Sequence, residues 1–534
     1  MRLEPALAPL LLGRAWRHPF RIAGIVCHWL YSSSQPTVFC VESFQLDIDN
    51  ARPGPCHLAS ASQEPRQDWT PAAKAVMKQL QDRLARDIAR LPLGRTQAGP
   101  HALTSLILEL PRRPNAIAQL PGTQFQLLHP QGDGLRAGYG LAAQWEAQGS
   151  DRLSTLARVT REWPACWEQG DPDGTGLRAF ALLGFAAAPE PALTPEEHLP
   201  NALLWVPDIA LRQTEEQAAL IFSAQQQQGR ASVHARWHRL LEDLIPGLFA
   251  PPRRPALVTR VAAEFTEPEQ SQWARLVEQA LECIHAENLQ KVVLSRRLGV
   301  KGSRSFDIAR LLDVLAAVFP SCQIINLRRG DQSFVAATPE RLLHLRDGRV
   351  AVDAIAGTTS HSDCEDRNLA LGEELLRSEK NLREHGFVVE AVAQALASSC
   401  RSIKIPRQPR LMRLRNAQHL WSPITAEINP GTGLFNLAEQ LHPTPATNGQ
   451  PRLAAHQWLR AQEPFSRGWY TGAAGFIEPD NSGELWVLLR CARIRGKQAE
   501  LFAGAGIVAG SDPGAEWEET ETKLAAMLTA LRFA

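Results

Sequence analysis

The spacing of apolar residues divides the first half of the chain into a helix, several short strands and two further helices. A helical period runs from Asp68 to about Leu91, and Thr70-Pro71 is typical of a helix start. Short apolar runs bounded by turn residues predict strands at 101–110, 124–129, 178–187 and 202–211. Helical spacing then returns and predicts helices at 215–228 and 232–244.

The second half follows the proline-rich segment 251–255, which is the clearest linker candidate in the sequence. Its spacing predicts helices at 269–287, 306–318, 367–397 and 513–531. It also predicts strands at 291–297, 323–327, 333–337, 351–356, 470–477, 485–495 and 501–508. Because strands and helices do not alternate strictly, these elements favour an α+β fold with large antiparallel sheets.

We expect three regions along the 534 residues: a poorly structured extension at 1–65, an N-terminal part of the fold at 66–250, and a second part at 256–534. Residues 1–65 contain few acids, several arginines and a serine run at 32–34, without a helical or strand period. A transit peptide has such a composition, which would imply a plastid protein. Because a processing signal of the Ala-x-Ala type is absent, a dispensable extension is favoured.

The composition is that of a globular protein, with 44% hydrophobic and 21% charged residues. The net charge of +1 indicates neither a nucleic-acid partner nor an anionic membrane. No apolar run approaches the length of about 18 residues that a membrane span needs. The nine cysteines include no CxxC pair, which favours free thiols in a reducing compartment such as the cytoplasm over disulfides or a zinc site.

Lys291 is the first candidate for chemistry, because only eight of the 57 Lys and Arg residues are lysines. It opens the apolar run KVVLSRR, which reads as a strand entering the core. Arg cannot release its proton in a protein, whereas Lys can act as a base once burial or a neighbouring cation lowers its pKa. The alternative is a lysine that lies along a strand edge with its ammonium group in solvent.

The last predicted helix carries Glu516, Glu519 and Lys523 on one face, after the cap Asp512-Pro513. A second carboxylate, Glu384, lies beside the apolar stripe of the long helix 367–397. One or two carboxylates with waters and substrate are the ligands that Mg²⁺ uses in proteins. The alternative for both helices is a solvated face held by ion pairs. Motifs of the Walker A, HExxH and G-x-S-x-G types are absent.

Together these segments resemble the chorismate-utilising enzymes, which include anthranilate synthase component I, aminodeoxychorismate synthase component I, isochorismate synthase and salicylate synthase. The resemblance covers roughly residue 260 to the end and is loose before it. The matching text is KVVLSRR (291–297), FVAATPERLL (334–343), AGT (356–358), SEKNLREHGFVV (378–389), QHL (418–420), LHPTPATNG (441–449), EPFSRGWYTGAAG (463–475), VLLR (487–490) and the segment 503–523.

The resemblance implies two large antiparallel sheets packed as a sandwich, with helices outside and the active site in the cleft between the sheets. It implies Mg²⁺ as cofactor, chorismate as the small-molecule substrate, no nucleic-acid or membrane partner, and a monomer or homodimer. It assigns Glu384 and Glu519 as metal ligands, with Glu516 in a supporting or water-mediated role. The matched positions of the substrate pocket are Gly357, Thr358, His419, Tyr470, Arg490, Gly504 and Lys523.

Tyr470 and Arg490 match the pair that grips the enolpyruvyl carboxylate, and an Arg fork suits a carboxylate. The other pocket positions have ordinary alternatives, namely a turn glycine, a core histidine for His419 and a surface lysine for Lys523. The loop after Thr358 departs from the familiar Gly-Thr-x-Pro-Arg-Gly, because here it continues Thr-Ser-His-Ser at 359–362.

Within the family, two positions select the nucleophile. Members that use ammonia lack a lysine at the position of Lys291, and the aminodeoxychorismate branch has a lysine where this chain has Ala356. Both positions therefore indicate water, which needs a general base. Lys291 is the expected base and Glu340 the expected general acid for the departing C4 hydroxyl, unless Glu340 only pairs with Arg341.

The resemblance thus implies an isomerase, isochorismate synthase, that adds water at C2 of chorismate and releases the C4 hydroxyl. A salicylate synthase, which also eliminates pyruvate, is the alternative that these motifs leave open. A non-catalytic chorismate-binding subunit is disfavoured, because such a protein is expected to have lost a carboxylate or the lysine.

We predict that deletion of residues 1–66, which leaves Gln67 at the start, leaves the melting temperature nearly unchanged, because the extension has no periodic core pattern. Scanning calorimetry of the full and shortened chains measures this. A large loss of folded, soluble protein in the shortened chain would contradict it.

Overall fold

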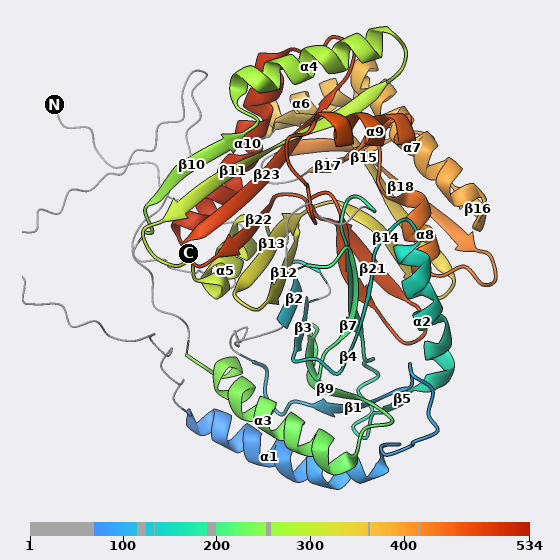
Figure 1. Ribbon diagram of the computed structural model, residues 1–534, viewed down its shortest axis with the longest axis vertical. Coiled ribbons are helices and arrows are strands. Elements are labelled where there is room, and N and C mark those ends of the chain that lie inside the picture. The colour runs from blue at the N-terminus through green and yellow to red at the C-terminus, as the bar shows by residue number, and fades with distance from the viewer. Residues whose placement is uncertain are drawn as a thin grey trace, which may run out of the picture. The chain divides into compact units, whose positions relative to one another are not determined.

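Two β-sheets form the framework of the protein (Figure 1). The computed structural model describes residues 69–114, 124–132, 134–189, 199–251, 258–360, 362, 364–413 and 417–534, so the expected extension at 1–65 lies outside the described residues. Strands from both halves of the chain are hydrogen-bonded in each sheet, and 67–252 with 258–534 form one compact unit.

The larger sheet has thirteen strands. In spatial order they are β10 (Val261–Glu267), β11 (Lys291–Gly302), β23 (Gln498–Ile507), β22 (Cys491–Arg495), β13 (Gln332–Thr338), β12 (Gln323–Arg329), β2 (Gln124–His129), β3 (Gly134–Tyr139), β8 (Ile209–Gln213), β9 (Ala218–Gln225), β1 (Leu103–Glu109) and β5 (Trp167–Gly170), with β19 (Gly449–Gln450) also paired to β11. Every pair in it is antiparallel except β1 with β5.

The second sheet has ten strands, all paired antiparallel. Their order is β16 (Cys400–Lys404), β18 (Ala417–Ile428), β15 (Arg349–Ser360), β14 (Arg341–Arg346), β21 (Gly483–Val487), β20 (Ala473–Ile477), β6 (Ala181–Phe185), β7 (Ala202–Val206) and β4 (Ala143–Ala147), with β17 (Arg410–Arg413) also on β18. The predicted α+β class with two large antiparallel sheets is confirmed.

Helices lie on the outside of the sheets (Figure 1). They are α1 (Pro71–Asp87), the short 3-10 helix η1 (Ile88–Arg90), α2 (Arg152–Cys166), α3 (Arg230–Leu248), α4 (Gln270–His285), α5 (Ile308–Val318), α6 (Glu365–Arg377), α7 (Glu379–Ala397), α8 (Leu434–Leu441), α9 (Arg452–Gln462) and α10 (Pro513–Arg532). In the part of the chain that is described, no helix is long and apolar enough to cross a membrane.

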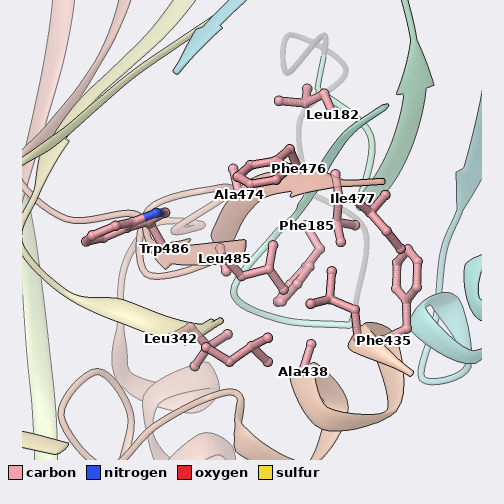
Figure 2. Close-up of a cluster of buried hydrophobic side chains, with 14 of the residues drawn as sticks. Leu182, Phe185, Leu342, Phe435, Ala438, Ala474, Phe476, Ile477, Leu485 and Trp486 are labelled. Atoms are coloured by element: carbon pink, nitrogen blue, oxygen red, sulfur yellow. The ribbon is translucent and has the colours of Figure 1, made fainter. Parts of the chain in front are cut away.

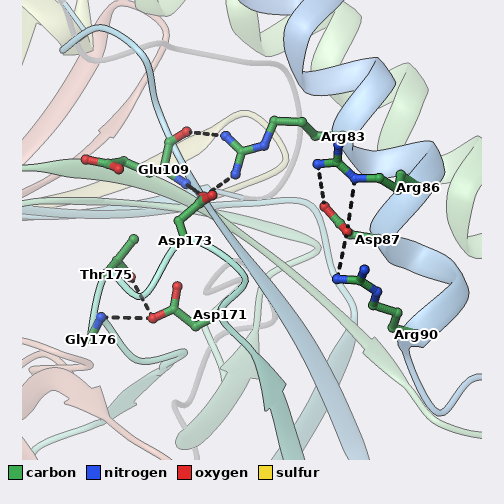
Figure 3. A network of polar contacts seen from close by, with 9 residues as sticks. All are labelled: Arg83, Arg86, Asp87, Arg90, Glu109, Asp171, Asp173, Thr175 and Gly176. Carbon is green, nitrogen blue, oxygen red and sulfur yellow. Dashed lines mark hydrogen bonds and ion pairs between the residues drawn. The ribbon is translucent and has the colours of Figure 1, made fainter.

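The main core lies between the sheets and continues under α8, where Phe435 and Ala438 pack on strands β6, β20 and β21 (Figure 2). A second core lies on the opposite face of the larger sheet, under α1 and α3. Polar contacts help to fix α1: Arg83 pairs with Asp173 and donates to the carbonyl of Glu109 on β1 (Figure 3). The larger sheet is therefore covered on both faces, which explains the apolar runs of its strands.

The structure corrects four sequence predictions. Segment 215–228 is strand β9 and not a helix, because its apolar run faces a core on both sides of the sheet. The predicted helix at 367–397 is two helices, since Ser378 ends α6 and its side chain caps α7. The predicted strands at 202–211 and 485–495 each contain two strands that lie in different sheets. Helices α2, α8 and α9 were not predicted.

Candidate active site

The candidate site begins where the chain passes from one sheet to the other. Strand β21 ends at Val487, strand β22 begins at Cys491, and the linking Arg490 has a positive φ of 46°. Thr471, also at positive φ (61°), donates its N–H to the carbonyl of Leu488 at 2.9 Å. This bond brings the turn that carries Tyr470 next to the turn that carries Arg490, twenty residues further along.

Two glycines of β23 make room for the side chains beside them. A Cβ on Gly504 would lie 2.9 Å from the hydroxyl of Tyr470, and one on Gly506 would lie 3.0 Å from Cε of Lys291. Tyr470 is buried and stacks on Phe502, with ring centroids 5.4 Å apart. Burial raises the pKa of Tyr470, so its hydroxyl stays a hydrogen-bond donor at neutral pH.

Lys291 is buried at the start of β11 and is 8% exposed. Its Nζ lies 2.9 Å from Oε1 of Glu384 on α7, which packs on β15 of the other sheet. The ion pair therefore connects the thirteen-stranded sheet to the helix on the ten-stranded sheet. Lys291 is not the solvent-directed strand-edge lysine of the alternative interpretation.

On α10, Lys523 and Glu519 lie near the same strand, β23. Lys523 donates from Nζ to the carbonyl of Gly504 at 2.8 Å and to Oε1 of Glu519 at 2.7 Å. Both side chains remain about half exposed, at 43% and 51%. Glu516, one turn earlier, is half-buried. The face predicted from the i, i+3, i+7 spacing thus exists, and Lys523 joins it to β23.

Strands β15 and β18 contribute Gly357, Thr358 and His419. Gly357 has a φ of 76° at a register shift of β15, a conformation that favours glycine, and Asn381 of α7 lies against it. The hydroxyl of Thr358 lies 2.9 Å from Nδ1 of His419. Burial, with the charges of Arg490 and Lys523, lowers the pKa of His419 to about 4, so its ring is neutral at pH 7.

Glu340 lies in the turn between β13 and β14, and its carbonyl accepts from the N–H of Val487 at 2.9 Å. Burial raises the pKa of this carboxyl to about 7, and the charge of Asp353 adds to the rise. The ammonium groups of Lys291 and Lys523 and a hydrogen bond from Thr444 oppose it. The charges of both lysines therefore act on the carboxyl of Glu340.

The alternative pairing of Glu340 with Arg341 does not occur. The guanidinium of Arg341 instead binds Asp353 at 2.9 Å and Glu484 at 3.3 Å. Glu340 therefore lacks a pairing guanidinium from its sequence neighbour, and desolvation is the largest influence on its pKa.

The contacts link the predicted site residues into one group. Glu384 pairs with Lys291, Glu519 pairs with Lys523, and Glu340 lies in the field of both lysines. Gly504 contacts Tyr470 and Lys523, while His419 lies in the field of Lys523 and Arg490. Glu516 lies on α10, one turn before Glu519.

Sequence reasoning missed Thr444, Gly506, Glu463 and Arg467. All four belong to quoted motif segments, and the buried pair of Glu463 and Arg467 lies in the EPFSRGWY segment. An i, i+4 acid–base pair usually marks a solvated helix face. The pair stands directly before Gly-Trp-Tyr at 468–470. This apolar and aromatic neighbourhood was the available signal that the pair is buried.

One cavity of about 310 Å³ lies elsewhere, lined by residues of β2, β3, β14, β20 and β21. It includes Arg136, Arg341 and Glu484 but none of the predicted site residues. The candidate site is therefore defined by its converging ionisable groups. Among the described residues, no group of three or more His, Cys, Asp or Glu side chains converges as a metal cluster would.

A family model described as "Chorismate binding enzyme" matches residues 105–532. The chain belongs to this family of chorismate-binding enzymes. The chorismate-binding fold is also found in MenF, the menaquinone-specific isochorismate synthase from Escherichia coli, whose structure matches with a TM-score of 0.72 and 26% identity over 86% of this chain and all of that one. Anthranilate synthase component I from Streptococcus pneumoniae shares the fold with a TM-score of 0.59, at 20% identity over 79% of this chain and 93% of that one.

Among curated relatives of this chorismate-binding enzyme, isochorismate synthase MenF of Bacillus subtilis is 36% identical over 51% of this chain and 58% of the relative. The salicylate biosynthesis isochorismate synthase of Pseudomonas aeruginosa is 36% identical over 52% of this chain and 59% of the relative. The chain thus spans less than two thirds of the length of these two relatives.

We predict that Glu340→Gln changes the pH dependence of stability. Because the folded pKa of about 7 exceeds the ordinary 4.5, the folded state holds the proton more tightly, and Glu340 destabilises the fold increasingly as pH rises through this window. The melting temperature of Glu340→Gln minus that of the wild type should therefore rise from about pH 5 to about pH 8.

The exposed Glu373, which pairs with Arg377 on the surface of α6, provides the control. Glu373→Gln should show a difference in melting temperature that hardly varies with pH. An equally flat difference for Glu340→Gln would show that Glu340 is not held in its neutral form.

Proposed function

We propose that the protein is an isochorismate synthase that converts chorismate to isochorismate. The observation that carries this proposal is that a buried lysine, Lys291, acts electrostatically on a half-buried carboxyl with a raised pKa, that of Glu340. Replacement of the allylic C4 hydroxyl by water at C2 needs a base for the incoming water and an acid for the departing hydroxyl. The names of the relatives from Bacillus subtilis and Pseudomonas aeruginosa support the same reaction.

In the proposed reaction, Lys291 acts as the neutral amine: its Nζ takes a proton from water as the water oxygen bonds to C2 of chorismate. The ring double bond shifts, the bond from C4 to its hydroxyl breaks, and Glu340 donates its proton so that this hydroxyl leaves as water. One water enters and one leaves, so the product is an isomer. At neutral pH a carboxyl with a pKa of about 7 is present in both forms, which suits an acid that must be recharged.

Two groups are proposed to bind the carboxylates of the substrate, which is a dianion. The guanidinium of Arg490 and the protonated hydroxyl of Tyr470 are both donors, and a carboxylate accepts from both. Neutral His419, held by Thr358, adds a donor or acceptor without a second positive charge. Because the ring of His419 is neutral, the positive charge that faces the substrate's carboxylates there is proposed to come from Arg490 and Lys523.

Glu384 and Glu519 are proposed to hold Mg²⁺, with Glu516 in support. The donor set fits this ion, because both groups are carboxylates from separate helices and each already binds an ammonium group, Lys291 or Lys523. When bound, the ion would supply positive charge that holds and polarises the ring carboxylate of chorismate. The proton transfers proposed above are carried out by Lys291 and Glu340.

We expect purified protein to convert chorismate to isochorismate when Mg²⁺ is present, and to stop when EDTA is added.

Glu384→Gln and Glu519→Gln should each lose nearly all turnover with little change in melting temperature. Glu390 is exposed on α7, and Glu390→Gln should keep the wild-type turnover. Separation of the products by liquid chromatography measures this. Salicylate with pyruvate would indicate a salicylate synthase, and full activity in EDTA would contradict the metal site.

We expect Lys291→Arg to lower the rate of water addition by about 10²-fold or more, because Arg keeps the charge but cannot accept a proton. Lys301, an exposed lysine at the far end of the same strand, is the matched control, and Lys301→Arg should keep the wild-type rate. A near-normal rate in Lys291→Arg would overturn the role of Lys291 as base without affecting membership of the family.

A further inference from the structure

A buried ion pair, that of Glu463 and Arg467, is bonded to the backbone of segments that carry residues of the candidate site. Arg467 forms two bonds to the carboxylate of Glu463, at 2.7 Å from Nε and 2.5 Å from Nη2. The two side chains are only 11% and 6% exposed, so this is not a surface pair. A buried pair is costly to desolvate and persists where the remaining donors and acceptors are also satisfied.

The remaining donors of Arg467 bind the backbone of two other segments. Nη1 donates to the carbonyl of Thr447 at 2.7 Å, and Nη2 donates to the carbonyl of Val293 at 2.6 Å. The carboxylate of Glu463 in turn accepts from the N–H of Ser295 at 3.0 Å. The pair thus holds β11 at two alternate residues.

Each segment that the pair holds carries a group of the candidate site. Val293 is two residues from Lys291 on β11, and Thr447 is three residues from Thr444, which donates a hydrogen bond to Glu340. The carbonyl of Arg467 accepts from the N–H of Tyr470 at 3.0 Å. Base, acid and carboxylate-binding groups are therefore connected to one guanidinium through short stretches of backbone.

We propose that the Glu463–Arg467 pair is a positioning unit that fixes the spacing of Lys291, Glu340 and Tyr470. The roles of those three groups rest on the proposed function. The bonds that join the pair to the three backbone segments do not depend on it. Only an arginine can provide it, because lysine lacks the planar fork needed to bind a carboxylate bidentately and two carbonyls together. A displacement of about 1 Å between reacting groups can cost up to 10²-fold in rate.

The test uses Arg467→Lys, Glu463→Gln and the double variant of the full chain. Hydrogen exchange followed by mass spectrometry should show faster exchange in three segments, 291–295, 444–448 and 468–472, because their shared anchor is weakened. The kcat with chorismate should fall at least about tenfold, with a smaller change in KM. Since the two residues act as one unit, the double variant should be no slower than the slower single variant.

Arg236→Lys is the matched control, because Arg236 forms a similar partly buried pair with Asp208, at 2.7 Å, between α3 and the turn before β8. It should leave both kcat and exchange in the three segments unchanged. Unchanged exchange in these segments in Arg467→Lys would overturn the proposal. Faster exchange spread evenly over the whole protein would also overturn it, because it would show general destabilisation.

The two proposals fail in different ways. A wild-type protein that does not turn over chorismate would refute the proposed function, and the exchange measurement would still decide whether the pair positions the three segments. A wild type that is active, with variants that keep its kcat, would refute the positioning role alone.

Discussion

The passage of the chain from one sheet to the other between Val487 and Cys491 is the constraint on which the candidate site depends. There the backbone turns through a positive φ at Arg490, and the bond from Thr471 to Leu488 holds the neighbouring turn against it. A non-glycine residue at positive φ costs free energy, so it persists only where surrounding contacts fix it. As a result the turns that carry Tyr470 and Arg490 lie next to each other where the chain passes between the two sheets.

Around this junction, three carboxylates and two lysines compensate one another. Glu384 and Glu519 each have a lysine partner, whereas Glu340 is half-buried and lies in the field of both lysines. Burial of Lys291 and desolvation of Glu340 reduce stability, because ionisable groups are costly to desolvate. The same desolvation raises the pKa of Glu340, and a shifted pKa is typical of functional sites. The large apolar cores on both faces of the thirteen-stranded sheet offset that cost.

Rigid support beneath the site comes from backbone as much as from side chains. Gly504 and Gly506 let Tyr470 and Lys291 approach β23 closely, and a side chain at either position would displace one of them. The pair of Glu463 and Arg467 joins β11 to the 444–448 loop and to the turn before Tyr470. The match to the chorismate-binding family extends over 105–532 and therefore includes all of these residues.

Local apolar spacing predicted most elements of the second half, including β11 and α10, because amphipathic elements reveal the face they bury. It failed for β9, which is apolar on both faces, and at 202–211 and 485–495, where one apolar run continues through a change of sheet. Spacing along the chain contains no information on which sheet a strand joins, because pairing is decided by distant partners.

The sequence by itself determined which residue types are available: a rare lysine at 291, carboxylates at 340, 384 and 519, and glycines where close approach is needed. The tertiary structure decided their relations. It joined Lys291 to Glu384 across 93 residues, raised the pKa of Glu340 by partial burial, and placed the i, i+4 pair of Glu463 and Arg467 in the interior. These relations could not be read from the chain, because desolvation and ion pairing depend on groups that only the packing of the two sheets brings together.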